Sequence, residues 1–475
     1  MIGNACLSRL RTAFLIAACG ALSFTSCNVA FAAKDKPKNA VKQSAKLSKN
    51  TTKITTKKVA KRAKKPVIVS NNASLLTTAP SFNSSTSPSS SPPISLGTSP
   101  TLTPGKTYSD SGPEPQLARV FKEVEGNRLD EAMREVESLL KSYPNFRLGH
   151  LIRGDLLLAR ARPITAFGGG SNAPANKLTD LRDEAIARLK GYREKPPANY
   201  VPRYLLQLQP EQKYAVVVDT QKARLYLYEN VNGQPRFVAD YYISHGKAGG
   251  NKLREGDMKT PIGVYHVTGN LSGQKLGDFY GSGAYPISYP NEWDKRQGRN
   301  GHGIWLHGTP SDTFSRPPRA SEGCVVLANQ DLDALGKTLQ IGTTPIIISN
   351  SIEWLSLDDW QAERTTLQKS IAEWRADWES LDTDKYLRHY AKNFKAGNQN
   401  LVQWTAQKRQ VNVGKKWAKV ATNNVSMFRN PGTEEMVVVT FDQDYRSSNL
   451  SNQMKKRQYW VKEEGTWKII YEGAA

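Results

Sequence analysis

The stretch "WLHGTPSDTFSRPPRASEGCVVLANQ", Trp305 to Gln330, decides how the rest of the chain is interpreted. It places His307 after an apolar run and Cys324 directly after a Ser-Glu-Gly turn. A cysteine near its ordinary pKa of about 8.5 is mostly protonated at neutral pH, so it needs a neighbouring base to become a nucleophile. Backbone N–H groups that face the attacked carbonyl complete an acyl-transfer site. The stretch therefore predicts His307 as base, Cys324 as nucleophile and Gly323 as the residue that shapes the turn.

The N-terminal residues have the order of a secretory signal peptide. Arg9 and Arg11 precede the apolar run "AFLIAACGALSFTS", and small residues follow up to Ala32. The apolar run is shorter than the roughly 20 residues that cross a bilayer. We therefore expect residues 1–32 to be removed near Ala32 and the rest of the chain to be exported to the periplasm.

The remaining cysteines all lie inside this predicted signal peptide, at Cys6, Cys19 and Cys27. A lipoprotein anchor at Cys19 or Cys27 is an alternative, although both fit the required pattern poorly. After cleavage near Ala32, Cys324 would be alone in the mature chain and no intramolecular disulfide could form. An unpaired cysteine in an exported protein indicates a reactive thiol or an intermolecular link.

The formal net charge of +23 is concentrated after the signal peptide. Residues 34–65 carry 13 Lys and Arg against one acid, Asp35, and Ser70 to Pro104 is rich in Ser, Thr and Pro. Such composition predicts a disordered linker over residues 33–112. Two alternatives remain for the basic tail: it rests on an anionic envelope surface, or it has no role. Nucleic acid is not expected as a target of an exported protein.

Beyond the linker the pattern predicts a multidomain chain with three folded parts. Residues 113–200 have helical periodicity and resemble a tetratricopeptide-type hairpin, so we expect a helical module that serves packing or partner proteins. Residues 212–350 alternate with period two and predict a mostly β domain. Residues 360–475 begin with long helices and end in strands, which indicates a separate α+β domain.

The middle part resembles the L,D-transpeptidase (YkuD-type) catalytic domain family. The matching blocks are "SHGKAGGNKLREGDMKTPIGVYHV", "YGSGAYPISYPN", "GIWLHG" with His307-Gly308, and the turn Ser321 to Cys324. The resemblance implies that Cys324 attacks a peptidoglycan tetrapeptide stem at the diaminopimelate L-centre, releases D-alanine and forms a thioester. It also implies that His307 activates the thiol, that the Gly308 carbonyl orients His307, and that the N–H groups of Gly323 and Cys324 bind the oxyanion.

Two positions near the cysteine depart from the family pattern. Glu322 stands where histidine is common, and Val326 where arginine or asparagine is common. Ser321 is expected to shape the turn or contact substrate. Arg316 and Arg319 are candidates to bind the substrate carboxylate in place of the missing polar group, the alternative being that both are simply solvated.

Three other histidines lie in the predicted β domain. His302 is a candidate to line the cleft, while His245 and His266 lie on strand patterns and are expected to be structural. A zinc site from His302, His307 and Cys324 lacks a fourth ligand, so no metal and no cofactor are predicted.

The C-terminal part resembles the nuclear transport factor two superfamily, a cone of bent sheet wrapped on helices. We expect a binding or pairing module there, because no paired acid and base stand out. The combination with the catalytic part resembles cell-shape L,D-carboxypeptidases, in which water resolves the thioester. The leading prediction is a transpeptidase that forms cross-links or wall-protein links. Trimming of tetrapeptide to tripeptide and a non-catalytic wall-binding scaffold remain the alternatives.

Overall fold

A computed structural model describes residues 112–169, 172–432 and 434–475 of the chain. The predicted signal peptide, residues 1–32, and nearly all of the predicted linker, residues 33–112, lie outside the described residues. All described residues belong to one compact unit. Within them, no helix has the length and apolar character needed to cross a bilayer.

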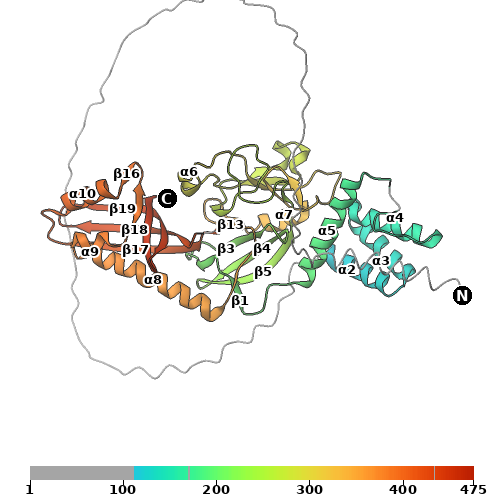
Figure 1. The fold of residues 1–475 in the computed structure, drawn as a ribbon, viewed down its shortest axis with the longest axis horizontal. Helices are drawn as coiled ribbons and strands as arrows, with labels where there is room; N and C mark the ends of the chain where they lie inside the picture. The colour runs from blue at the N-terminus through green and yellow to red at the C-terminus, as the bar shows by residue number, and fades with distance from the viewer. Residues whose placement is uncertain (1–111, 170–171, 433) are drawn as a thin grey trace, which may run out of the picture. The chain divides into compact units, whose positions relative to one another are not determined.

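The N-terminal module is helical, as its periodicity predicts (Figure 1). Its helices are α2 (Glu114–Glu125), α3 (Leu129–Ser142), α4 (Arg147–Ala161) and α5 (Ala175–Arg193). Leu117, Val120 and Val124 repeat at intervals of three and four and are buried in a common core with the other helices. Helix α2 ends just before Asn127, whose φ of 62° is incompatible with continued helix.

The central domain is built on a five-stranded sheet with the strand order β5-β4-β3-β13-β7. Its strands are β3 (Tyr214–Asp219), β4 (Arg224–Val231), β5 (Gln234–Tyr242), β7 (Gly263–His266) and β13 (Pro345–Ser349). Asn232 and Gly233 both have positive φ and make the tight connection between β4 and β5, as the "VNGQ" signal predicts. Strand β13 is buried along its whole length because both faces of the sheet are covered.

Smaller sheets carry the rest of the central domain. A four-stranded sheet contains β8 (Leu271–Ser272), β9 (Gly283–Pro286), β10 (Trp305–His307) and β12 (Val325–Val326), and a two-stranded sheet pairs β6 (His245–Gly246) with β11 (Arg319–Ser321). Short helical segments connect them, namely η2 (Gly273–Lys275), η3 (Asp278–Tyr280), α6 (Glu292–Arg296) and α7 (Asn329–Gly336).

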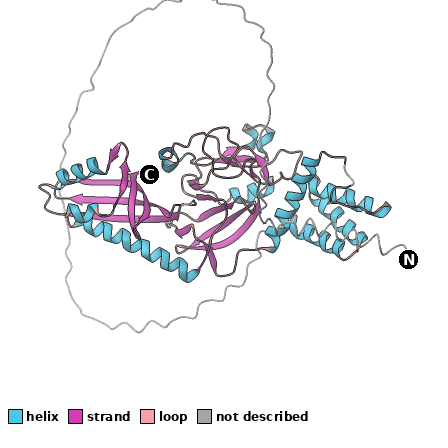
Figure 2. Ribbon diagram, viewed as in Figure 1, coloured by secondary structure: helices cyan, strands magenta, loops and turns pink. Residues whose placement is uncertain are grey.

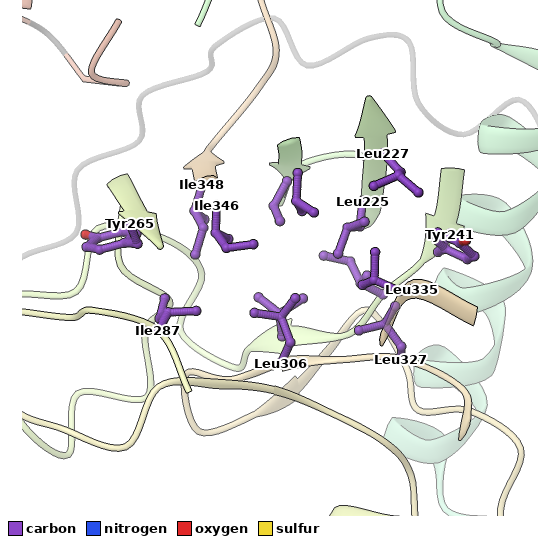
Figure 3. Close-up of a cluster of buried hydrophobic side chains, with 14 of the residues drawn as sticks. Leu225, Leu227, Tyr241, Tyr265, Ile287, Leu306, Leu327, Leu335, Ile346 and Ile348 are labelled. Atoms are coloured by element: carbon purple, nitrogen blue, oxygen red, sulfur yellow. The ribbon is translucent and has the colours of Figure 1, made fainter. Parts of the chain in front are cut away.

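One apolar core joins the two larger sheets of this domain. In Figure 3, Leu225, Ile346 and Ile348 from the five-stranded sheet face Leu306 and Leu327 from the opposite side. All five side chains are essentially inaccessible to solvent. Because β10 enters this core through Leu306, the strand that carries His307 is held rigidly against the main sheet.

The C-terminal domain combines helices with a strongly paired sheet (Figure 2). Its helices are α8 (Leu357–Glu379), α9 (Thr383–Leu387) and α10 (Leu401–Asn412). Its strands are β15 (Tyr390–Ala396), β16 (Gln399–Asn400), β17 (Ala418–Arg429), β18 (Met436–Ser447), β19 (Ser451–Glu463) and β20 (Thr466–Ala474). Trp360, Trp374 and Trp378 of α8 pack onto the sheet and form most of the aromatic core with it.

Segments between the predicted domains also take part in the sheets. Strand β2 (Leu205–Gln207) pairs with β17 and becomes the edge of the C-terminal sheet, whereas β1 (Tyr200–Pro202) pairs with β14 (Trp354–Ser356). The chain therefore contributes an edge strand to its last domain before it enters the central one. The element order confirms the predicted class, a mostly β central domain flanked by helices and by an α+β domain.

Candidate active site

His307 and Cys324 lie at neighbouring parallel strands of the four-stranded sheet. Strand β10 pairs with β12 so that Leu306 is opposite Val325 and His307 is opposite Val326. Leu306 and Val325 both point into the core. Since side chains alternate along a strand, His307 and Cys324 are directed to the other face of the sheet. The pairing thus brings the two predicted reactive residues to one surface, although 16 residues separate them along the chain.

The ring of His307 is buried and oriented by its own backbone. Its Nδ1 lies 2.7 Å from the carbonyl oxygen of Gly308. A carbonyl oxygen only accepts, so Nδ1 carries the proton and Nε2 is left as the acceptor. Phe279 and Tyr280 flank the ring at centroid distances of 5.9 and 5.2 Å. Burial lowers the pKa of His307 to about 4, so the ring is neutral at neutral pH.

The Cys324 thiol is partly exposed and donates to the carbonyl oxygen of Gly303 at 3.4 Å. Burial raises the pKa of the thiol, whereas a backbone N–H of Trp305 and the positive charges of Arg316 and Lys252 oppose that rise. Within the described ranges, no hydrogen bond joins the thiol to His307. The resting site is therefore a neutral thiol beside a neutral imidazole.

The turn before Cys324 is held by hydroxyl groups. The hydroxyl of Ser321 donates to the Cys324 carbonyl at 2.6 Å and accepts from the Gly323 amide at 3.1 Å, so Ser321 shapes the turn. The φ of Gly323 is 133°, and an added Cβ would lie 2.8 Å from the Lys259 carbonyl oxygen, so only glycine fits. The Gly323 amide already donates to the Ser321 hydroxyl. It can bind an oxyanion only after this hydrogen bond breaks.

The sequence did not predict the roles of two residues that position the loops, Thr260 and Asn329. The buried Thr260 donates to the Gly323 carbonyl at 3.0 Å and accepts from the Gly246 amide at 2.9 Å. Thr260 belongs to the "TPIG" block of the family pattern. The pattern alone does not predict its hydrogen bonds to the turn before Cys324.

Asn329 is the second positioning residue, and it joins three loops. Its Oδ1 accepts from the amides of Ser282 and Thr309 at 2.9 and 3.1 Å, and its Nδ2 donates to the Thr309 carbonyl at 2.8 Å. A Cβ on Gly308 would lie 2.0 Å from Asn329 Oδ1, so glycine is required at that contact. A single asparagine at the start of a helix gives no sequence signal of such long-range bonding.

The candidate substrate-binding residues differ in their surroundings. The Arg316 guanidinium stacks on Phe279 at 4.4 Å and donates to its carbonyl at 3.3 Å, and its charge influences the pKa of both Cys324 and His307. Arg319 is exposed in β11. The side chain of His302 is 81% exposed and lies 3.5 Å from Glu255. Of these candidates, Arg316 is the cation whose charge lowers the pKa of the Cys324 thiol.

The structure also shows the surroundings of the two residues that depart from the family pattern, and it bears on the zinc alternative. Val326 is buried in β12, and Glu322 is exposed with Lys247 at 3.8 Å. His245 is buried, and burial lowers its pKa to about 4. In the part of the chain that the structure describes, no three His, Cys, Asp or Glu residues gather closely enough to hold a metal ion.

The C-terminal domain contains its own cavity of about 430 Å³. It is lined by aromatic residues, including Trp378 and Trp404. Lys456 and Glu472 form a buried ion pair at 2.6 Å there, and burial lowers the pKa of Lys408 to about 8. The sequence did not reveal this acid and base because they lie on adjacent strands, sixteen residues apart.

Two parts of the chain are similar to known protein families. Residues 213–348 match the model of the L,D-transpeptidase (YkuD) catalytic domain. Residues 213–348 therefore form a domain similar to this catalytic family. Residues 366–473 match the Cds6 C-terminal NTF2-like domain. YafK of Escherichia coli (strain K12) is 30% identical over 116 residues, which cover 24% of this chain and 42% of that protein. The chain thus spans less than half the length of the curated relatives it matches.

Solved structures extend the similarity over both later domains. The structure of Bdellovibrio bacteriovorus Bd1075 is 30% identical, covers 58% of this chain and 98% of its own, and gives a TM-score of 0.52. The helical cell shape determining protein Pgp2 of Campylobacter jejuni is 25% identical, covers 57% of this chain and 95% of its own, and gives a TM-score of 0.50. The predicted combination of an L,D-transpeptidase domain with an NTF2-like domain is confirmed.

Proposed function

We propose that the protein is a cysteine-dependent L,D-transpeptidase that acts on peptidoglycan tetrapeptide stems. The supporting observation is the pairing of β10 with β12, which directs Cys324 and a tautomerically oriented His307 to one face of the sheet. The match of residues 213–348 to the family names the reaction class, and the geometry supplies residues suited to it.

The first half-reaction follows from the protonation states of the pair. Sγ of Cys324 attacks the carbonyl carbon that precedes the terminal D-alanine, and its proton moves to Nε2 of His307. His307 then gives this proton to the departing amine, the C–N bond breaks, and a thioester remains. Because burial depresses the pKa of His307, the ring is an unprotonated base over the physiological range.

Stabilisation of the oxyanion is assigned to backbone amides of the turn. The Cys324 amide is one donor in this proposal, and the Gly323 amide becomes the second if it leaves the Ser321 hydroxyl. Arg316 is assigned to the substrate carboxylate, because its guanidinium lies near the thiol and, among the described residues, forms no ion pair with a carboxylate of the chain. Arg319 and His302 are assigned to the outer part of the cleft.

Hydrolysis of the same thioester is the second candidate. The partly exposed thiol leaves room for water, and water as acceptor would convert tetrapeptide to tripeptide. The likeness to Pgp2, a helical cell shape determining protein, favours a role in cell shape. Because the N-terminal residues have the order of a secretory signal peptide, we expect either activity in the periplasm.

Mass spectrometry of tetrapeptide muropeptides after incubation with the protein, with and without an acceptor stem, tests the proposal. We expect cross-linked dimers that depend on Cys324 and disappear in Cys324→Ala. Asp333→Ala is the control, since Asp333 is exposed on α7 and lies outside the turn that carries Cys324. Tripeptide alone would establish the carboxypeptidase. Unchanged muropeptides, with wall binding retained in Cys324→Ala, would indicate the scaffold alternative.

A further inference from the structure

Helix α6 of the central domain packs on the sheet of the C-terminal domain. Trp293 stacks on Tyr459 of β19 at a centroid distance of 5.6 Å, and both side chains are buried. Nη1 of Arg457, also on β19, donates to both carboxylate oxygens of Glu292 at 2.7 and 2.9 Å. Arg296 donates to two backbone carbonyls of the same sheet at 2.9 and 2.6 Å. Because aromatic packing and charge-assisted hydrogen bonds act together here, the C-terminal sheet determines where α6 lies.

Helix α6 leads into residues 297–303, which we call the thiol loop. The Asp294 carboxylate accepts from Nη1 of Arg299 at 3.1 Å, and the Asp294 carbonyl accepts from the Arg299 amide at 2.9 Å. Asn300 joins the thiol loop to the connection between β6 and β7, since its Oδ1 accepts from the Glu255 amide at 3.0 Å. The thiol loop is therefore attached to α6 at its start and to a second loop at its middle.

The thiol loop ends at the reactive cysteine. The carbonyl of Gly303 accepts from the Cys324 thiol at 3.4 Å. Gly301 and Gly303 have φ values of 110° and 70°, and glycine restricts its own backbone less than any other residue does. The position of the Gly303 carbonyl therefore depends on the contacts that hold the thiol loop, namely those of Asn300 and of α6.

We propose that the C-terminal domain positions Cys324 through α6 and the thiol loop, with Arg457 as the positioning residue. The inference rests on the proposed function, because it assigns a further residue to that reaction. Arg457 touches neither the thiol nor the substrate. It holds Glu292, so α6 stays on the sheet and the Gly303 carbonyl stays against the thiol. This role of the C-terminal domain is separate from any ligand of its own cavity.

The contact with Gly303 affects the thiol in two ways. A carbonyl that accepts from S–H stabilises the neutral thiol, so loss of this contact lowers the pKa of Cys324. The same contact places Sγ, and a misplaced nucleophile reacts more slowly with a bound substrate. Release of the thiol loop therefore speeds alkylation by a small reagent and slows acylation by the substrate. The other charged or titratable groups around the thiol stay the same, namely His307, Arg316, Lys252 and Glu322.

The test reverses one charge in the full-length protein. Arg457→Glu places a carboxylate against Glu292 and repels α6 from the sheet. Arg446→Glu is the matched control, because it makes the same charge change at an exposed position of β18. Phe441→Leu, which loosens the C-terminal core, is the second control, because Phe441 packs against Trp374 of α8. A charge-swapped variant, Glu292→Arg with Arg457→Glu, restores the ion pair with the opposite polarity.

Three quantities are measured for each variant. Alkylation of Cys324 by iodoacetamide is followed from about pH 6 to pH 9. Intact-protein mass spectrometry follows thioester formation on a D-alanine-terminated tetrapeptide, and thermal unfolding gives the Tm. The negative charge added in Arg457→Glu disfavours the thiolate, so its direct electrostatic effect slows alkylation and cannot imitate the expected result.

We expect Arg457→Glu to be alkylated at least about threefold faster near pH 7 and to form thioester at least about fivefold more slowly. The charge-swapped variant should recover much of both losses. Arg446→Glu and Phe441→Leu should stay within about twofold of the parent in both rates, the latter despite a lower Tm.

The inference is overturned if Arg457→Glu is alkylated at the parental rate, if Phe441→Leu reproduces its effects, or if the charge-swapped variant is no better than Arg457→Glu. Absence of any thioester in the parent would refute the proposed function instead. The alkylation rates would then still decide whether Arg457 positions the thiol.

Discussion

At the scale of single residues, the reactivity of Cys324 depends on opposing influences. Burial raises the pKa of the thiol, and the positive charge of Arg316 lowers it. Burial also lowers the pKa of His307 to about 4, so a thiolate–imidazolium pair is not the resting state. In the proposed reaction the nucleophile is therefore made during the attack, by transfer of the thiol proton to His307, and we expect its rate to respond to charge near the sulfur.

Replacing Arg316 should slow modification of the thiol. In Arg316→Ala the lowering of the Cys324 pKa by the guanidinium is lost, so the pKa rises and less thiolate is present at any given pH. We expect iodoacetamide to react at least about twofold more slowly near pH 8, with the whole rate profile displaced to higher pH. Arg319→Ala is the control, because Arg319 is exposed in β11. Equal profiles for both variants would contradict this assignment.

At the scale of elements, the site depends on how short strands and turns are tied together. Strands β10 and β12 are only a few residues long, and their pairing is supported by the core contacts of Leu306 and Val325. Asn329, in the first turn of α7, then joins the loop after β10 to the start of β9 by three hydrogen bonds. Short strands have little intrinsic stability, so such bonds maintain the placement of His307.

Removing the Asn329 side chain should therefore impair catalysis and stability together. Asn329→Ala leaves two amides and a carbonyl without their partner, and each lost bond costs about 1–3 kcal/mol where it is shielded from water. We expect a fall in the melting temperature and a loss of thioester formation of at least about tenfold. Asp333→Ala, an exposed position on the same helix, should affect neither. Wild-type behaviour of Asn329→Ala would show that the loops hold without it.

At the scale of the whole molecule, a group of charges joins the helical module to the central domain. Arg188 of α5 lies 2.6 Å from Glu114, and Glu114 lies 3.5 Å from Arg224 of β4. Asp240 is the other partner of Arg224. Burial raises the pKa of the nearby Asp331 to about 7, and Glu114 adds to the rise. We therefore expect the stability of this contact to depend on pH.

The direction of that sensitivity follows from linkage. An acid with a raised pKa in the folded protein keeps its proton longer when folded, so its stabilisation is complete below about pH 4 and is lost as pH rises through about 7. In Asp331→Asn this titration is absent. We expect the decrease in melting temperature between pH 5 and pH 8 to be at least about 2 °C smaller in that variant. The exposed Asp333→Asn is the control, and an unchanged decrease in Asp331→Asn would disprove the assignment.

Much of the site was accessible from the sequence, because the signals were local. The helical spacing of Leu117, Val120 and Val124 predicts a buried stripe, and "VNGQ" predicts a hairpin, since both depend on residues close along the chain. The order of the blocks around His307-Gly308 and Cys324 predicts the family that residues 213–348 match. The signal peptide, the linker and the roles of individual site residues stay predictions.

The sequence by itself determined the domain types and their order, and it indicated the histidine, the cysteine and the glycine-containing turn as the candidate site. The tertiary structure alone decided that β2 becomes the edge of the C-terminal sheet, that Asn329 and Thr260 hold the loops of the candidate site, and that the helical module packs on the loop around Phe314. The physical reason is the distance along the chain over which each interaction acts. Backbone periodicity and turn chemistry act over a few residues, whereas these contacts join segments far apart in the chain and become definite only when the domains pack.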